Sequence, residues 1–291
     1  MEIKEYKSKI NEEIVLLLGF FDCLHSGHRK LVFDAKTLGY KTAIFTFTDK
    51  YNLKDNKVVY SFSERVIVFE KAKIDLVLFA DFDDNFKNLS ANDFLMAVSK
   101  NYNLKGIVCG YDYKFGKNAA GNTDTIKSFC LENNLECIIS KKVEINGEKV
   151  SSSLVKKFLK EGNILKANIL LSDEYFISGI VETGRKIGNT LGFPTANIHY
   201  DKHKSEIKEG VYKVYSYIDG IKYAGICNYG IKPTFNNYER TIEVFYKNYS
   251  GNLYGKNITV YFVDYIRDII KFNEINGLKN QLNKDLEQLN D

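Results

Sequence analysis

Hydrophobic positions in the first half of the chain alternate between short continuous runs and helical patterns. Four apolar runs predict buried strands at residues 14–18, 42–47, 76–80 and 106–109. Apolar residues three or four positions apart predict the intervening helices at residues 27–38, 63–73, 91–102 and 123–133, with Ser63 and Ser90 as N-caps of the second and third. This alternation predicts a parallel sheet with helices on both faces, and two short helices at 153–160 and 163–171 close this half.

The second half of the chain has a different pattern. Runs rich in Val, Ile, Tyr and Phe, separated by Gly, Asn or Asp, predict antiparallel strands at residues 175–181, 211–218, 222–227, 241–246 and 258–265. Asp219-Gly220 favours a tight hairpin between two of them. A final apolar stripe predicts a C-terminal helix that packs on the core through Ile275, Leu278, Leu282, Leu286 and Leu289. We therefore predict two domains, an α/β domain over residues 1–171 and a small antiparallel barrel over residues 172–291.

Composition excludes several classes of protein. With 44% hydrophobic and 27% charged residues among 291, the chain has an ordinary globular composition and is not a disordered protein. The longest apolar run, residues 14–21, is far shorter than the roughly 20 residues of a membrane span. The first residues alternate charges and show no secretory signal. Five cysteines without a C-x-x-C pair predict reduced thiols, and we expect a cytoplasmic protein.

The net charge of +4 lies entirely in residues 1–171, and residues 172–291 are neutral. Neither half has the basic excess of a protein that binds many nucleic-acid phosphates. We therefore expect small-molecule partners and no nucleic acid.

The segment Gly19-Phe20-Phe21-Asp22-Cys23-Leu24-His25-Ser26-Gly27-His28 is the clearest chemical motif. It follows the first predicted strand and leads into a helix, and it holds two of the four histidines of the chain. Ligands of open α/β sheets bind at such strand ends, where backbone N–H groups favour anions. Two imidazoles at this place can hydrogen-bond phosphate oxygens as negative charge develops at phosphorus. A cap for the helix and a polar surface residue would be the alternative roles of the two histidines.

This segment resembles the nucleotidylyltransferase superfamily, and the form G-x-F-D-x-x-H-x-G-H is most similar to bacterial flavin adenylyltransferases. Residues 108–116, with Gly121 beyond, resemble that family's G-x-D-F-x-F-G loop, and residues 150–156 resemble its I-S-S-T-x-I-R segment. The resemblance implies a Rossmann-like fold, His25 and His28 as catalytic residues, and Phe115 as a flavin contact. It further implies an ATP and phosphate site built from Gly19, Phe21, Asp22, Gly27, Gly110, Asp112, Ser152, Ser153 and Lys156.

The second half carries Leu191-Gly192-Phe193-Pro194-Thr195-Ala196-Asn197. On a strand, the Thr hydroxyl and the Asn amide would share one face, and such neutral oxygens suit Mg²⁺ that is held mainly by phosphates and water. The segment resembles the G-F-P-T-A-N signature of riboflavin kinases, whose other motifs follow in order. The resemblance implies that Thr195 and Asn197 hold the metal, that Gly192 and Pro194 contact ATP, that Glu243 is the general base and that Arg267 contacts flavin.

The chain departs from the family pattern at a few positions. Cys23 stands where Gly is usual, and Thr46-Phe47-Thr48-Asp49 lacks the usual Pro-His. Lys156 and Asn189 each replace an Arg, and Phe245 stands where His is common. A lysine keeps the charge of arginine but loses its bidentate fork.

Over residues 14 to 289 the motifs together resemble the bacterial bifunctional riboflavin kinase/FMN adenylyltransferase (FAD synthetase) family. The resemblance implies that ATP and Mg²⁺ serve two consecutive reactions, riboflavin to FMN in the barrel and FMN to FAD in the α/β domain. One alternative is an adenylyltransferase whose barrel is a weak or inactive kinase that only binds flavin. A second is a Tyr-rich barrel that binds RNA, which the neutral charge of residues 172–291 disfavours.

Overall fold

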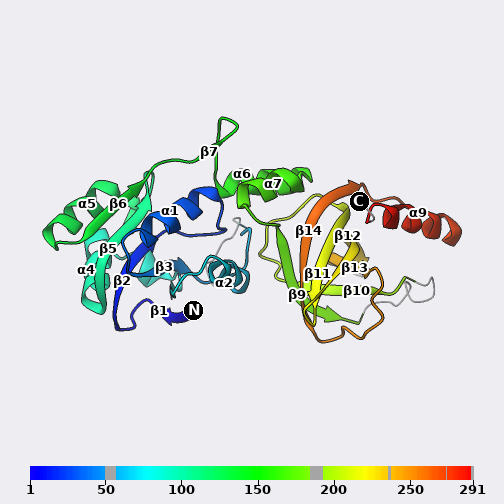
Figure 1. Cartoon of the computed structure of the whole chain (residues 1–291), viewed down its shortest axis with the longest axis horizontal. Coiled ribbons are helices and arrows are strands. Elements are labelled where there is room, and N and C mark those ends of the chain that lie inside the picture. Colours follow the sequence, from blue (N-terminus) through cyan, green and yellow to red (C-terminus); the bar gives the residue numbers. More distant parts are fainter. Residues whose placement is uncertain (50–56, 184–192, 235–236, 273, 290–291) are drawn as a thin grey trace. The chain divides into compact units, whose positions relative to one another are not determined.

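The computed structural model describes residues 1–49, 57–183, 193–234, 237–272 and 274–289 (Figure 1). They form two compact units, Met1–Ser152 and Ser153–Asp291. The first unit is built on an open six-stranded sheet, and the second on a closed six-stranded barrel. This confirms the predicted α/β domain followed by a small antiparallel barrel.

The sheet of the first unit is parallel and has the order β1-β4-β3-β2-β5-β6. Its strands are β1 (Glu2–Glu5), β2 (Ile10–Leu18), β3 (Lys41–Phe47), β4 (Leu76–Ala80), β5 (Tyr102–Gly110) and β6 (Glu136–Ser140). From β2 the chain proceeds outward through β3 and β4 and then returns to place β5 on the other side of β2. The strand order therefore reverses between β2 and β5, which in open α/β sheets opens a crevice at the carboxyl ends of these strands.

Alternating side chains of the strands face two helical layers. Leu16, Phe45 and Ile107 belong to a core that includes residues of α4 (Ala91–Asn101) and α5 (Thr123–Glu132). Val15 and Ile44 are buried on the opposite face, where α1 (Ser26–Lys36) lies along the strands. The helices α2 (Phe62–Lys71) and α3 (Asp84–Lys87) complete the unit.

Several local predictions need correction. Ser61, and not Ser63, is the N-cap of α2, where it forms a capping box with Glu64. The strands β1 and β6 and a short hairpin, β7 (Glu144–Ile145) with β8 (Glu148–Lys149), were not predicted. The edge strand β1 lacks an apolar pattern because three of its four residues are charged.

The barrel of the second unit is antiparallel and closes in the order β10-β13-β12-β11-β14-β9. Its strands are β9 (Phe176–Glu182), β10 (Thr195–Tyr200), β11 (Gly210–Ile218), β12 (Ile221–Thr234), β13 (Asn237–Tyr246) and β14 (Asn257–Arg267). As predicted, Asp219-Gly220 forms the tight turn between β11 and β12, and both residues have positive φ. The C-terminal helix α9 spans Ile275–Glu287 and contacts β12.

Two helices, α6 (Ser152–Glu161) and α7 (Ile164–Leu171), group with the barrel in the second unit. The Asn168 side chain of α7 donates to the Phe262 carbonyl of β14 at 3.0 Å and accepts from the Tyr175 N–H at 2.8 Å. The Leu159 carbonyl of α6 accepts from the Lys208 N–H at 3.0 Å. The predicted boundary at 171/172 assigned both helices to the first domain, whereas the division into compact units falls after Ser152.

We predict that a fragment of residues 153–291 is more stable than a fragment of residues 172–291. Truncation at 172 removes the buried side chains of α6 and α7, and each large apolar side chain contributes roughly 1.5–3 kcal/mol when buried. The loss of several such side chains approaches the whole stability of a small domain, about 5–15 kcal/mol. Urea unfolding of both fragments measures the difference. Equal midpoints and slopes would place the domain boundary at 171/172.

Candidate active sites

The first candidate site lies at the reversal of strand order between β2 and β5. Leu18 and Cys109 are register partners at the ends of these two strands. The histidine motif starts at the next residue after Leu18, and the second motif continues from Gly110 at the end of β5. The topology therefore brings the two predicted motifs to neighbouring strand ends.

The turn from β2 into α1 is fixed by close contacts. Phe21 has a left-handed φ of 48°, and its ring folds back over Gly19, where a Cβ would lie 2.9 Å from the Phe21 ring. Gly19 is required for this approach. Asp22 is 3% exposed and accepts a hydrogen bond from the Val59 N–H at 2.6 Å. These contacts hold the backbone that carries the two histidines.

His25 and His28 form one hydrogen-bonded, stacked pair. His25 is the N-cap of α1, and its Nδ1 accepts from the His28 backbone N–H at 3.2 Å. His28 Nδ1 lies 2.5 Å from the Cys23 carbonyl oxygen. The two rings stack with centroids 3.8 Å apart and planes inclined by 12°. One histidine thus caps a helix, as the structural alternative proposed, and at the same time belongs to a pair at the strand end.

These hydrogen bonds determine the tautomers of both rings. Because His25 Nδ1 accepts, its hydrogen lies on Nε2; because a carbonyl only accepts, His28 Nδ1 donates and its Nε2 carries a lone pair. Burial lowers the pKa of His25 to about 2, with the neighbouring His28 contributing, and burial lowers the pKa of His28 to about 4. At neutral pH the pair therefore presents one N–H donor and one basic nitrogen.

The loop after β5 carries the second predicted motif. Asp112 accepts from the Lys149 ammonium at 2.6 Å, and Gly110 lies beside the Asp112 carboxylate. Phe115 is 8% exposed and stacks on Tyr113 in the core, with ring centroids 5.6 Å apart. Phe115 anchors this loop, and its contact with flavin stays a prediction.

The predicted serine and lysine residues fall on both sides of the unit boundary. In the first unit, Ser152 Oγ lies 3.6 Å from Cys23 Sγ, so this segment adjoins the histidine loop. Ser153 and Lys156 lie in the first turns of α6 and belong to the second unit. Their roles in binding phosphates stay predictions.

Arg65 is a central residue of this region that the sequence pattern did not reveal. Its side chain is fully buried and donates to Thr46 Oγ1 at 2.7 Å, to the Phe47 carbonyl at 2.8 Å and to Asp49 at 3.1 Å. The ring of Phe20 lies 5.3 Å from the guanidinium. Arg65 therefore joins the ends of β2 and β3, and Asp49 supplies its counter-charge in the segment that lacks the usual Pro-His.

The second candidate site lies on the barrel, where three predicted residues share one face. Asn197 of β10 and Glu243 of β13 are register partners, and Thr195 lies two residues before Asn197 on the same face. Thr195, Asn197 and Glu243 are half-buried, whereas Ala196 between the first two is buried. On its other side, Asn197 is the register partner of the exposed Glu182 of β9.

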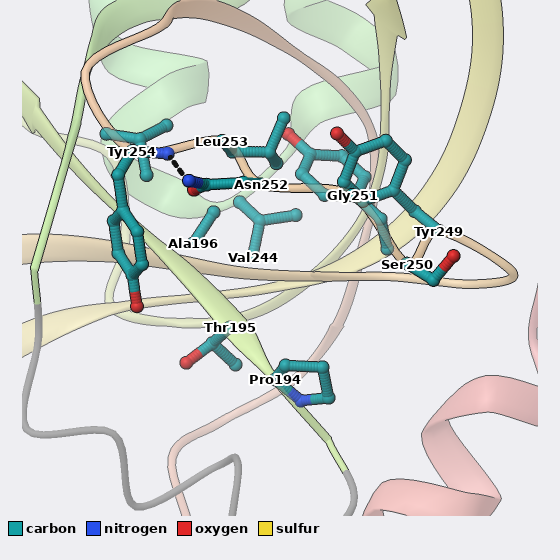
Figure 2. A pocket seen from close by; sticks show the side chains of 12 residues that line it. Pro194, Thr195, Ala196, Val244, Tyr249, Ser250, Gly251, Asn252, Leu253 and Tyr254 are labelled. Carbon is teal, nitrogen blue, oxygen red and sulfur yellow. Dashed lines mark hydrogen bonds between the residues drawn. The ribbon is translucent and has the colours of Figure 1, made fainter.

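A cavity of about 350 Å³ opens beside Thr195 (Figure 2). Pro194 and Thr195 lie at one side, Ala196 and Val244 form its apolar floor, and the loop of residues 249–254 covers it. Two tyrosines of this loop, Tyr249 and Tyr254, also line the cavity. The lining thus combines apolar and aromatic groups with a few polar atoms, as small-molecule sites do.

Other predicted barrel residues have different surroundings. The Arg267 guanidinium forms a two-pronged ion pair with the buried Asp285 of α9, at 2.9 and 2.6 Å, so it holds the C-terminal helix. Its contact with flavin stays a prediction. Phe245 packs against Phe193, with ring centroids 5.4 Å apart. Gly192 and Asn189 lie outside the described residues.

A transition-metal site requires converging His, Cys, Asp or Glu side chains. Within the described residues, no group of three or more His, Cys, Asp or Glu side chains converges as metal ligands. Among these same residues no helix is long and apolar enough to cross a membrane.

Comparison with known proteins identifies a family for each half of the chain. The family model for FAD synthetase matches residues 7–154, and that for riboflavin kinase matches residues 171–291. A Buchnera aphidicola (subsp. Schizaphis graminum) protein described as bifunctional riboflavin kinase/FMN adenylyltransferase is 35% identical over 96% of this chain and 94% of its own length. A Bacillus subtilis protein with the same description is 32% identical over 98% and 93%. A crystal structure described as a macrolide-efflux protein from Streptococcus pneumoniae is 29% identical, with a TM-score of 0.86 over 99% and 97% of the two chains.

The α/β unit and the barrel, with the family match of each, define a two-domain transferase that acts on phosphates. The chain belongs to the bifunctional riboflavin kinase/FMN adenylyltransferase family. It phosphorylates riboflavin to FMN and adenylylates FMN to FAD, with ATP as the second substrate of both reactions. The match to riboflavin kinases favours this interpretation of the barrel over an RNA-binding module.

We predict that the histidine pair makes the first unit sensitive to acid. The unfolded chain binds a proton at His28 near its ordinary pKa of 6.5, whereas the folded chain does so only near pH 4. Stability is therefore lost as the pH falls through this window, by about 3 kcal/mol for His28. In urea titrations between pH 7 and pH 4, His28→Gln is expected to lose about 3 kcal/mol less than the parent protein. Parallel stability profiles would contradict the burial of a neutral His28.

Proposed function

We propose the following assignment of roles in the kinase barrel. ATP occupies the cavity beside Thr195, with its base among the apolar and tyrosine side chains and its phosphates toward Thr195 and Asn197. Glu243 removes the proton of the riboflavin 5′-hydroxyl, whose oxygen then attacks the γ-phosphorus while ADP leaves. The observation that carries this proposal is the register of Asn197 against Glu243, with Thr195 at the edge of the cavity.

The residues at this position fit a magnesium ion that comes with ATP. Thr195 and Asn197 offer neutral oxygens on one strand face, and Mg²⁺ in phosphate sites takes most of its ligands from phosphates and water. When bound, the ion would neutralise charge on the transferring phosphoryl group. Thr195 and Asn197 would hold it, and the protein's own contribution is to orient the nucleotide and to accept the hydroxyl proton.

The substitution of Phe245 for the usual histidine is accommodated by packing. Phe245 is the register partner of Thr195, and its ring contacts Phe193, so an apolar pair lies beside the proposed metal residues. This arrangement leaves the Asn197 and Glu243 pairing regular.

For the adenylyltransferase unit we propose that His25 and His28 stabilise the charge that develops at the α-phosphorus of ATP. An oxygen of the FMN phosphate attacks this phosphorus, and pyrophosphate leaves. His25 donates from Nε2–H, and His28 accepts a proton at Nε2 when the anionic substrates arrive, which turns its lone pair into a second donor. Ser152, Ser153 and Lys156 are proposed to hold the departing phosphates.

We predict that Glu243→Gln lowers the rate of riboflavin phosphorylation by about 10²–10⁴-fold with little change in the affinity for Mg·ATP, because a general base acts in the chemical step. Thr195→Val and Asn197→Ala are expected to weaken Mg·ATP binding as well. Initial rates of FMN formation and calorimetric titration of Mg·ATP measure the two effects.

Glu182→Gln is the matched control, because Glu182 is the other carboxylate beside Asn197 and is exposed. It should phosphorylate riboflavin at the parent rate. A loss of activity in Glu182→Gln together with parent activity in Glu243→Gln would contradict the proposal, because it would place the base on β9 and not on β13. Parent rates in both variants would show that neither carboxylate is the base.

A further inference from the structure

The predicted phosphate role of Asp112 leaves a chemical problem. An ionised carboxylate only accepts hydrogen bonds, and its charge repels the phosphates of ATP and FMN. Asp112 nevertheless follows directly after β5, at the reversal of strand order where the two motifs meet. A cation next to Asp112 would reconcile this position with an anionic ligand.

Lys149 is that cation. Its ammonium donates to Asp112 Oδ2 at 2.6 Å and lies 5.0 Å from the centre of the Tyr111 ring, so it contacts two successive residues of the loop after β5. Lys149 is the last residue of β8, where it pairs with Glu144 of β7. The Val150 N–H donates to the Val143 carbonyl at 3.0 Å and closes this hairpin. The hairpin therefore delivers the ammonium to a defined place.

The segment that follows Lys149 runs alongside the histidine motif of residues 19–28. A Cβ on Gly27 would lie 4.0 Å from the Val150 carbonyl oxygen, and Ser152 Oγ lies 3.6 Å from Cys23 Sγ. The charge of Lys149 also contributes to the lowered pKa of His25. Lys149 thus belongs to the same neighbourhood as the start of α1, although no sequence motif marks it.

We propose that Lys149 is a phosphate-binding residue of the adenylyltransferase site and that Asp112 positions it. An ammonium has three N–H donors; Asp112 and the Tyr111 side chain engage two of them, so one remains for a phosphate oxygen. The Lys149 side chain is 48% exposed, which leaves it open to a ligand. Asp112 keeps the long side chain oriented before the substrate arrives, which reduces the entropy lost on binding. The ligand is a phosphate group, either of ATP or of FMN.

The test uses the full-length protein and steady-state kinetics of FAD formation, with ATP and FMN varied separately. Lys149→Met should lower kcat/KM about 10- to 100-fold, as expected for a lost hydrogen bond to a charged group. A rise in KM for ATP alone, or for FMN alone, identifies which substrate supplies the phosphate. Lys149→Arg should retain most of the activity. Riboflavin phosphorylation in the same samples reports on the integrity of the rest of the chain.

Two further variants separate binding from a structural role. Lys142→Met is the matched control, because Lys142 forms a comparable exposed ion pair with Glu144, at 2.7 Å, on the same hairpin. It should behave like the parent protein. Asp112→Asn breaks the same ion pair as Lys149→Met but keeps the cation, so its loss of kcat/KM should be clearly smaller. Equal losses in Asp112→Asn and Lys149→Met, or parent kinetics in Lys149→Met, would overturn the proposal.

Discussion

The reversal of strand order beside β2 is the constraint on which the adenylyltransferase site depends. β3 lies on one side of β2 and β5 on the other. In open α/β sheets such a reversal of strand order is the place where ligands bind, at the carboxyl ends of the strands. Local contacts then hold the backbone of the loop after β2 in place. Phe21 folds over Gly19, and Asp22 holds Val59, so that α1 begins at a defined point beyond the strand.

Hydrogen bonds to the backbone give the two histidines different chemical properties. His25 uses Nδ1 to cap α1, and His28 uses Nδ1 to bind the Cys23 carbonyl, so the two Nε2 atoms differ in protonation. Burial keeps both rings neutral in the free protein. The free protein thus avoids two buried charges at this place. In the barrel, by contrast, the register of β10 and β13 sets the spacing between Asn197 and Glu243.

Much of this arrangement could be predicted from local sequence. Continuous apolar runs such as residues 76–80 gave strands with the correct bounds, and the Asp219-Gly220 turn and the Ser90 cap were correct. Elements whose signal is tertiary were missed. β1 is a mostly charged edge strand. β12 continues to Thr234, beyond the predicted end at residue 227, because β13 pairs with it as far as Thr234, whereas the pairing with β11 ends at Tyr229.

The residues of the candidate sites also differ in whether a local sequence signal marks them. The histidine motif is local, and its position followed from a strand, a glycine and a helix in sequence. Arg65 and Lys149 carry no local signal, because their partners lie in other elements: Thr46 and Asp49 for Arg65, and Asp112 for Lys149. The helices α6 and α7 follow the α/β pattern in sequence, but they group with the barrel in the second unit, where α7 contacts β14.

The central claim is that the histidine pair serves only the second of two reactions in one chain. The most direct measurement is a time course of His28→Ala with riboflavin, ATP and Mg²⁺, in which riboflavin, FMN and FAD are separated by chromatography. The account predicts that FMN accumulates at the parent rate while FAD forms about 10²–10³-fold more slowly. Formation of FAD at the parent rate would contradict it, and so would a proportional loss of FMN formation in a folded variant.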